Sequence, residues 1–346
     1  MLDMPRARKK DPGRELAAEG PDHQPLLPAI RDYRLERESA ITRKVDQLME
    51  TWNVGLSGEA IYVAQCLIVC GLPLKNSTAT HAVRSARLSD GSFIKVTFSR
   101  ASPHIPLPFW QDRAMVHFLT HRAVTRKSPM LQWERVNEYL SLFGLHESSG
   151  WNYRTVQERF IRVAYMDILV EYLDKIGRQL SLLKTPLIEG ARVNGDVDEE
   201  GNWVPSESMS KVLSNSGTAR VGQVFYEKLL KKPVPVPIEL LRVTHGSPRI
   251  QDYALFIYWR SFAGREASLI PWSALRNQFA DEDTNPRRWP QVFKKAIAVL
   301  KTLPAPFNLI EAVATPQGLQ IQPLPAGTSF FANHPKFDEL PQQSVR

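Results

Sequence analysis

The sequence predicts an α+β protein in which one folding unit occurs twice, and three observations lead to this prediction. First, residues 111–119 and 251–259 both begin with Gln-Asp and continue with apolar residues at helical spacing. Second, residues 130–133 and 269–272 follow those stretches, and each ends in tryptophan. Third, each copy then passes through a polar linker into a further amphipathic helix. Two copies of one unit are the economical explanation.

The segment before the first unit is expected to contain an arm, a helix and a hairpin. Residues 1–38 carry much charge and proline with few large apolar side chains, so we expect a flexible basic arm. Apolar residues at helical spacing predict a helix from residue 39. The apolar run 61–70 fits a helix or a strand, and we favour a strand beside the next element. That element is a hairpin of 82–88 and 93–98 around Asp90-Gly91.

Each unit is expected to run helix, short strand, helix, turn, helix and β-hairpin. In the first unit the last helix is expected over residues 155–175, with Ile168 and Leu169 buried, and its hairpin from Leu180 through an acidic turn to Trp203. In the second unit the last helix is expected over 290–303, followed by a hairpin around Thr315-Pro-Gln-Gly318. This order is typical of a winged helix-turn-helix. The predicted fold is therefore two such domains in tandem, after a small N-terminal helix and hairpin extension.

Composition shifts along the chain predict four segments. We expect a basic arm over residues 1–38, a first winged-helix domain with its extension over 39–230, a second winged-helix domain over 231–327 and a flexible tail over 328–346. A third strand or shared helix is expected around residues 221–230. The proline-rich run 233–237 is expected to be a stiff connector between the two domains.

Bulk properties narrow the function classes. The net charge of +8 and the isoelectric point near 9.4 favour a polyanionic partner. The two cysteines lie in one apolar run and cannot form a disulfide framework, and no stretch has the length of a membrane span. The sequence contains no phosphate-binding Gly-Lys-Ser/Thr, no His-x-His pair and no Gly-x-Ser-x-Gly. We therefore expect a non-enzymatic protein without a cofactor.

The last helix of the second unit supplies the main candidates for DNA contacts. In helix-turn-helix units, the N-terminal part of this helix enters the major groove while basic side chains reach phosphates. An ordinary solvated helix face is the alternative. The candidates are two arginines before the helix and four polar or basic side chains along it: Arg287, Arg288, Gln291, Lys294, Lys295 and Lys301.

The first unit has equivalent candidates, but acidic residues dilute their charge. Glu158 and Asp167 lie in the same predicted helix. A domain that contacts protein or dimerises is an equally favoured interpretation of this unit. The candidate DNA contacts are Arg154, Gln157, Arg159 and Arg162.

Two patterns resemble metal sites, but we expect neither to bind metal. His117 and His121 have the spacing of two zinc ligands on a helix, but the glutamate of a His-Glu-x-x-His site is missing. Residues 196–207 place acidic residues as in a calcium loop, but lack flanking helices and include Pro205. The acidic tip of a hairpin explains the second pattern better.

Several stretches resemble the plasmid-encoded RepA family of replication initiators. In the first half these are residues 83–98, 107–113 and 122–128; in the second they are 225–227, 233–237, 250–253, 270–272, 275–279 and 318–322. Together they span about residues 80–325. The family usually has a small residue in place of Trp110 and often a glycine in place of Ala280, so the local turns can differ.

The resemblance implies a role in the bacterial cytoplasm, at double-stranded plasmid origin DNA. It implies binding to repeated sites called iterons, opening of an adjacent A·T-rich region with the host initiator, and recruitment of the host replicative helicase. It also implies DNA-binding monomers and self-repressing dimers. A winged-helix transcriptional repressor without a replication role is the main alternative, and an enzyme acting on DNA is a further one.

Overall fold

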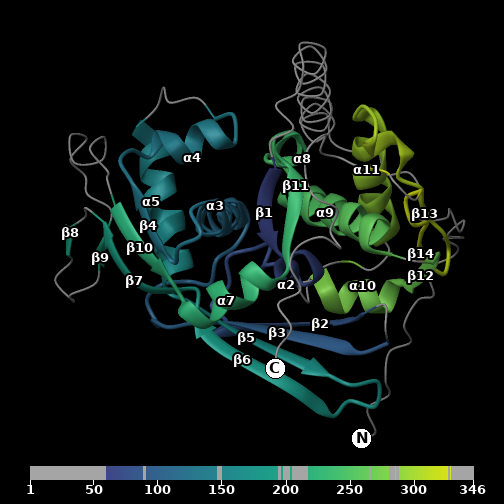
Figure 1. Cartoon of the computed structure of the whole chain (residues 1–346), viewed down its shortest axis with the longest axis horizontal. Coiled ribbons are helices and arrows are strands. Elements are labelled where there is room, and N and C mark those ends of the chain that lie inside the picture. Colours follow the sequence, from purple (N-terminus) through teal and green to yellow (C-terminus); the bar gives the residue numbers. More distant parts are fainter. Residues whose placement is uncertain are drawn as a thin grey trace, which may run out of the picture. The chain divides into compact units, whose positions relative to one another are not determined.

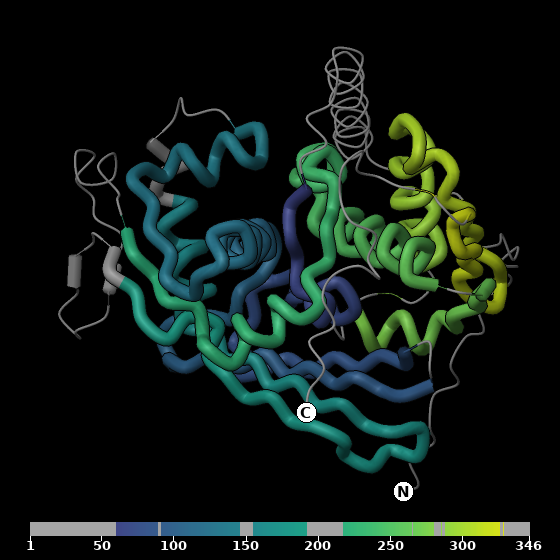
Figure 2. The backbone as a smooth tube through the Cα atoms, viewed as in Figure 1, coloured from purple at the N-terminus to yellow at the C-terminus, as the bar shows by residue number. Residues whose placement is uncertain are grey.

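The structure is a computed structural model with a mixed α+β fold, and it describes residues 60–88, 91–145, 150–193, 196–197, 203–204, 217–264, 266–279, 285, 288–325 and 328. The predicted arm, the helix expected from residue 39 and most of the tail lie outside these residues. No described helix has the length and apolar character needed to cross a bilayer. Figure 1 labels the elements, and Figure 2 follows the chain through them.

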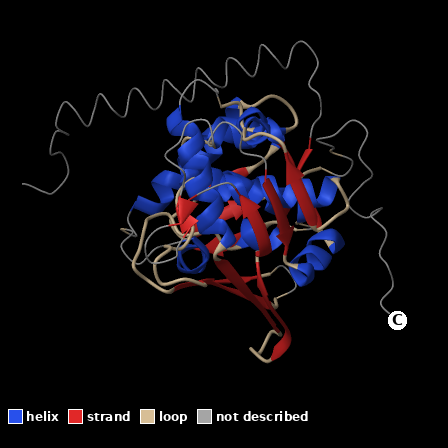
Figure 3. Cartoon of the chain, turned by 90° about the vertical axis from the view of Figure 1, so that its left-hand side faces the viewer, coloured by secondary structure: helices blue, strands red, loops and turns tan. Residues whose placement is uncertain are grey.

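The predicted hairpin is confirmed and belongs to a larger sheet. Strands β2 (His81–Arg87) and β3 (Phe93–Arg100) pair in antiparallel register, and Gly91 has the positive φ of 85° that this tight turn requires. The sheet continues with β5 (Met166–Leu173) and β6 (Gln179–Pro186) in the order β2-β3-β5-β6. The tip of the β5–β6 hairpin projects beyond the helices (Figures 1 and 3).

The first unit consists of three helices and a three-stranded sheet. Its elements are α3 (Asp112–Thr125), β4 (Met130–Trp133), α4 (Asn137–Leu142), α5 (Gly150–Ala164), β7 (Ile188–Val193) and β10 (Gly217–Val221). The strands have the order β4-β10-β7. Two short strands follow β7 in the sequence and precede β10: β8 (Asp196–Val197) and β9 (Trp203–Val204). They pair with each other in a separate two-stranded sheet.

The prediction of one helix over residues 155–175 is wrong in its second half. Helix α5 ends at Ala164, and Ile168 and Leu169 lie in strand β5. Buried and half-buried positions alternate along most of this strand, and it pairs with β3 on one side and with β6 on the other. Pairing with distant strands on both edges therefore overrides the local helical spacing. The hairpin expected from Leu180 is likewise replaced by β6 and β7, which belong to different sheets.

The second unit has the same order of elements as the first. It contains α9 (Pro248–Ala263), β12 (Ser268–Pro271), α10 (Trp272–Phe279), α11 (Trp289–Thr302), β13 (Ala312–Ala314) and β14 (Gly318–Ile321). A short 3-10 turn, η2 (Phe307–Leu309), precedes β13. In both units the strand after the first helix pairs with the last strand. The element order predicted for the second unit is therefore present.

The segment between the units contains a helix, a strand and a second helix. Helix α7 (Gln223–Lys231) follows β10, so the region around residues 221–230 contributes both a strand end and a helix. The expected proline-rich connector is strand β11 (Pro233–Pro237), which leads into α8 (Ile238–Thr244). It pairs with β1 (Ala60–Ala64), which continues into the short helix α2 (Gln65–Val69). The strand expected in the run 61–70 thus exists, but its partner is β11 and not the hairpin.

Alternate prolines explain how β11 can pair at all. Pro233, Pro235 and Pro237 lie two residues apart and therefore on one edge of the strand, which leaves the amides of Val234 and Val236 on the other edge. Strand β11 pairs with β1 on one edge of this two-stranded sheet. The prolines, which have no N–H group, can therefore lie on the edge that faces away from β1. Proline at this spacing is compatible with an edge strand, although it resembles a linker in sequence.

A buried ion pair connects α3 of the first unit to α9 of the second. Arg113 is 2% exposed, and its Nε lies 2.8 Å from Oδ1 of Asp252. The same guanidinium donates to the carbonyl of Leu72 at 3.1 Å. A Cβ at Gly71 would lie 2.9 Å from Oδ2 of Asp252, so the backbone approaches this carboxylate closely. These contacts hold α3, α9 and the loop that follows α2 against one another.

Candidate nucleic-acid interface

Helix α11 has one buried face and one exposed face. It begins at Trp289 with Pro290 in its first turn, where a missing N–H costs nothing. Its buried side chains recur at helical spacing and pack against α9 and the β13–β14 hairpin; they are Trp289, Phe293, Ala296, Val299 and Leu300. The exposed ones follow the same spacing on the opposite side; they are Gln291, Lys294, Lys295, Ala298, Lys301 and Thr302.

Aromatic packing holds this helix in place. The ring of Phe293 is fully buried and stacks on Tyr253 of α9, with centroids 4.0 Å apart and planes 4° from parallel. Trp272 lies 5.6 Å from the same ring, and Phe279 lies 6.5 Å from it. Because all three helices of the second unit contribute to this cluster, the exposed face of α11 keeps a defined orientation.

The exposed face carries positive charge without acidic neighbours on the helix. Residues 289–302 contain three lysines and no acidic residue. Arg288 is exposed immediately before the helix, at the end where the helix dipole also favours an anion. Lys301 donates a hydrogen bond from Nζ to the carbonyl of Asn308 at 3.0 Å, so its head group is partly tied to the protein. Arg287 lies outside the described residues.

Two features of the second unit that were not among the predicted DNA contacts also reach its surface. Arg276 and Asn277 are exposed on α10, the helix that precedes α11. The turn between β13 and β14 exposes Pro316 and Gln317. The helical period of residues 272–279 indicated that Arg276 would be exposed, because this arginine lies outside the apolar stripe formed by Leu275 and Phe279. The sequence predicted the turn itself, around Thr315-Pro-Gln-Gly318, but gave no signal that its exposed side chains could be contacts.

The first unit does not present its predicted contacts on one surface. Gln157 is 3% exposed and Arg159 is 8% exposed. Nη1 of Arg159 donates to the hydroxyl of Tyr139 at 3.1 Å, and Nη2 contacts the side chain of Gln111. Arg162 forms two hydrogen bonds to the carboxylate of Asp112, at 2.7 and 2.9 Å. The side chain of Arg154 is outside the described residues.

The packing of α5 explains this difference from α11. Helix α5 contacts α3 and strand β7, so residues 156–163 are buried with the exceptions of Glu158 and Arg162. A helix that is packed on both sides offers little surface to a DNA groove. Gln157, Arg159 and Arg162 therefore have internal partners or buried positions and do not form a surface for DNA.

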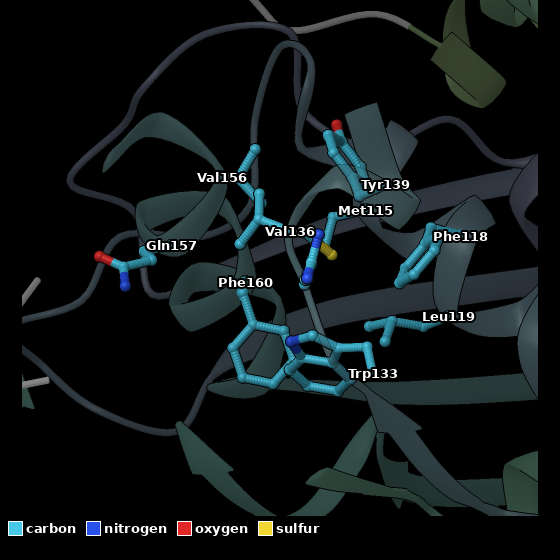
Figure 4. Close-up of a pocket in the computed structure, with 10 residues that line it drawn as sticks. Met115, Phe118, Leu119, Trp133, Val136, Tyr139, Val156, Gln157 and Phe160 are labelled. Carbon is cyan, nitrogen blue, oxygen red and sulfur yellow. The ribbon is translucent and has the colours of Figure 1, made fainter. Parts of the chain in front are cut away.

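A small apolar cavity lies inside the first unit, between α3, α4 and α5 (Figure 4). Its volume is about 30 Å³, and its lining includes Met115, Trp133, Val136, Tyr139 and Phe160. This is room for one or two water molecules and too little for an organic ligand. The cavity is therefore an imperfection of core packing.

The two histidines of α3 pack against other parts of the protein. His117 is 3% exposed, and burial, followed by the charge of Arg113, lowers its pKa to about 3. His121 accepts a hydrogen bond from the backbone N–H of Tyr62 at 3.4 Å and stacks on that tyrosine ring. Within the described part of the chain, no group of three His, Cys, Asp or Glu side chains could hold a metal ion. The acidic side chains of residues 196–207 lie outside that part.

Comparison with known proteins gives structural likeness without sequence relatives. No protein-family model matches the chain, and no curated protein matches it in sequence. A crystal structure of domains 2 and 3 of RctB is similar, with a TM-score of 0.46 and 14% identity over 72% of this chain and 87% of that one. A selenomethionine crystal structure of the same two domains gives a TM-score of 0.47 and 12% identity over 75% and 97%.

Proposed function

We propose that this chain is a plasmid replication initiator, in which the second unit acts as a winged helix-turn-helix that reads repeated sites in double-stranded origin DNA. The observation that carries the proposal is the division of α11 into a buried aromatic face and an exposed face of glutamine and lysines. An amide beside ammonium groups, on a rigidly held helix, suits a major groove lined by phosphates. On this proposal, the exposed side chains of Arg288 and Arg276 neutralise phosphates beside that groove.

The replication role rests on the resemblance of residues 80–325 to RepA initiators. On this proposal the protein acts in the bacterial cytoplasm, associated with its plasmid, and exists as monomers and self-repressing dimers. Its further partners are the host initiator and the host replicative helicase. The first unit, in which Gln157 and Arg159 are buried and Arg162 is paired internally, is assigned to protein contacts and not to base reading.

Two assays of the full chain test the proposal. In the first, footprinting on the DNA that flanks the gene should reveal protected repeats. In the second, the chain supplied in trans should allow a plasmid that carries only this DNA to replicate. Protected repeats without replication would favour a transcriptional repressor, and nicking of the DNA would indicate an enzyme. No preference for any duplex over scrambled DNA would refute the proposal.

Variants of α11 separate base reading from phosphate binding. Gln291→Ala should cost about 1–3 kcal/mol on the protected repeat alone, because the lost contact is to a base edge. Arg288→Ala should weaken binding to repeat and scrambled duplexes alike and lower the salt slope by about 1. Lys228→Ala, on the exposed face of α7, removes the same charge away from the interface and serves as the control. Equal losses on both duplexes for Gln291→Ala would show that specificity lies elsewhere.

A further inference from the structure

The turn that joins β13 to β14 is held on three sides. Inside the turn, the backbone N–H and the hydroxyl of Thr315 donate to the carbonyl of Gly318 at 2.8 and 2.9 Å. From α10, the indole N–H of Trp272 donates to the carbonyl of Thr315 at 3.1 Å. From β12, the carbonyl oxygen of Ile270 would lie 2.2 Å from a Cβ at Gly318. The turn is therefore attached both to the sheet and to α10.

Trp272 links this turn to the helix proposed to read DNA. Its ring packs 5.6 Å from Phe293 in the second turn of α11, while its N–H holds Thr315. Only Pro316 and Gln317 of the turn are exposed, and neither carries a charge. The second unit thus offers two rigidly connected features to a ligand, a basic helix face and an uncharged tip that ends in one amide.

We propose that Gln317 is a second DNA contact, which reaches the minor groove beside the major groove entered by α11, and that Trp272 is the positioning residue for it. This inference rests on the proposed function. A glutamine amide can donate to N3 of adenine or O2 of thymine, whereas the exocyclic amino group of guanine obstructs that approach. The turn therefore distinguishes A·T from G·C pairs at one position of the site.

The chemistry of the tip favours DNA over a protein partner. A protein interface needs a contiguous area far larger than two side chains can supply. A groove contact needs only one well-placed hydrogen-bonding group, and holding that group in advance lowers the entropy cost of binding. Because the tip is uncharged, its contact should add sequence discrimination without adding to the salt dependence.

The test uses the full chain and duplexes enriched by the wild-type protein from a pool with a randomised centre. Base pairs of the enriched duplex are replaced singly, A·T by G·C and A·T by inosine·cytosine. Inosine lacks the N2 amino group, so an inosine·cytosine pair keeps the minor-groove face of A·T but presents the major-groove face of G·C. Wild type should tolerate inosine·cytosine but not G·C at one or two positions beside the α11 site.

Gln317→Ala should abolish this discrimination and weaken binding to the enriched duplex about five- to tenfold, with an unchanged salt slope. Trp272→Phe removes only the indole N–H and keeps a ring beside Phe293. It should cause a smaller loss at the same positions, and adding it to Gln317→Ala should cause no further loss. If Trp272 only stabilised the fold, Trp272→Phe would instead weaken binding whichever base pair is substituted, both in the wild type and in the Gln317→Ala variant.

The outcomes distinguish this inference from the proposed function. If Gln291→Ala and Arg288→Ala weaken binding while Gln317→Ala matches wild type at every substituted pair, the second contact is refuted and the function stands. If the wild-type protein enriches no duplex from the pool, the proposed function itself fails. If the wild-type protein bound the inosine·cytosine duplex as weakly as the G·C duplex, the contact would also be refuted, because the discrimination would then occur in the major groove.

Discussion

His117 and His121 lie one turn apart on α3, and we expect acid to destabilise the fold through both of them. Burial, aided by the positive charge of a neighbouring arginine in each case, lowers the pKa of His117 to about 3 and that of His121 to about 4. In the unfolded chain both titrate near 6.5. Below that pH the unfolded state binds protons at both histidines and the folded state does not, so the free energy of unfolding falls.

The pKa values set the size of the effect. Each pH unit below 6.5 costs about 1.4 kcal/mol per histidine, so His117 costs about 2 kcal/mol at about pH 5. His121 costs about as much at this pH, because its pKa in the folded state, about 4, also lies below that pH. Asp252 acts in the opposite direction, since burial raises its pKa to about 6 despite the nearby Arg113. Asp252 is protonated at a higher pH in the folded state than in the unfolded state, which returns about 1 kcal/mol at about pH 5 and leaves a net loss of about 3 kcal/mol.

Urea unfolding at a series of pH values, followed by tryptophan fluorescence, measures this loss. His117→Leu removes one titrating group without opening a large cavity, so its stability relative to wild type should rise by about 2 kcal/mol between about pH 7.5 and pH 5. His104→Gln replaces an exposed histidine and is the matched control. Parallel pH dependences of wild type and His117→Leu over this window would refute the reasoning.

Two further predictions concern the second unit. Phe293→Leu should cost about 2 kcal/mol in urea unfolding, because the ring is fully buried and loses its stack on Tyr253; a cost below about 0.5 kcal/mol would show that the aromatic cluster does not hold α11. Gly318→Ala should cost about 1–3 kcal/mol, because the added Cβ would lie 2.2 Å from the carbonyl oxygen of Ile270. Gly190→Ala in β7 meets nothing within 4 Å and is its control, so equal melting temperatures of the two variants would contradict this account.

Local pattern was sufficient to predict the repeated unit. The starts of the three helices in each unit, the short strands after α3 and α9, and the hairpin around Gly91 all follow from spacing or turn chemistry within about ten residues. The exposed face of α11 was predictable for the same reason. Its buried and exposed positions alternate with the helical period, so Gln291, Lys294 and Lys295 had to lie opposite Phe293 once the helix formed.

Where partners are distant in sequence, local pattern was not sufficient. Met166–Leu173 forms a strand because β3 and β6 provide ladders on both sides, and β3 lies more than 60 residues earlier in the chain. Pro233–Pro237 resembles a linker and becomes a strand because β1 lies beside it. In both cases the sequence of the segment fits more than one conformation, and the neighbouring strands decide which one forms.

The sequence by itself determined that this is a basic α+β protein with a repeated unit, and it determined which side chains of α11 face outward. Only the tertiary structure decided that the two repeats differ in what they expose. Helix α5 is packed between α3 and β7, so Arg159 and Arg162 bind partners within the fold, whereas α11 is packed on one side and leaves its lysines at the surface. The physical reason is that periodicity reports which side of a helix is apolar, while the number of neighbours that cover a helix depends on contacts far away in the chain.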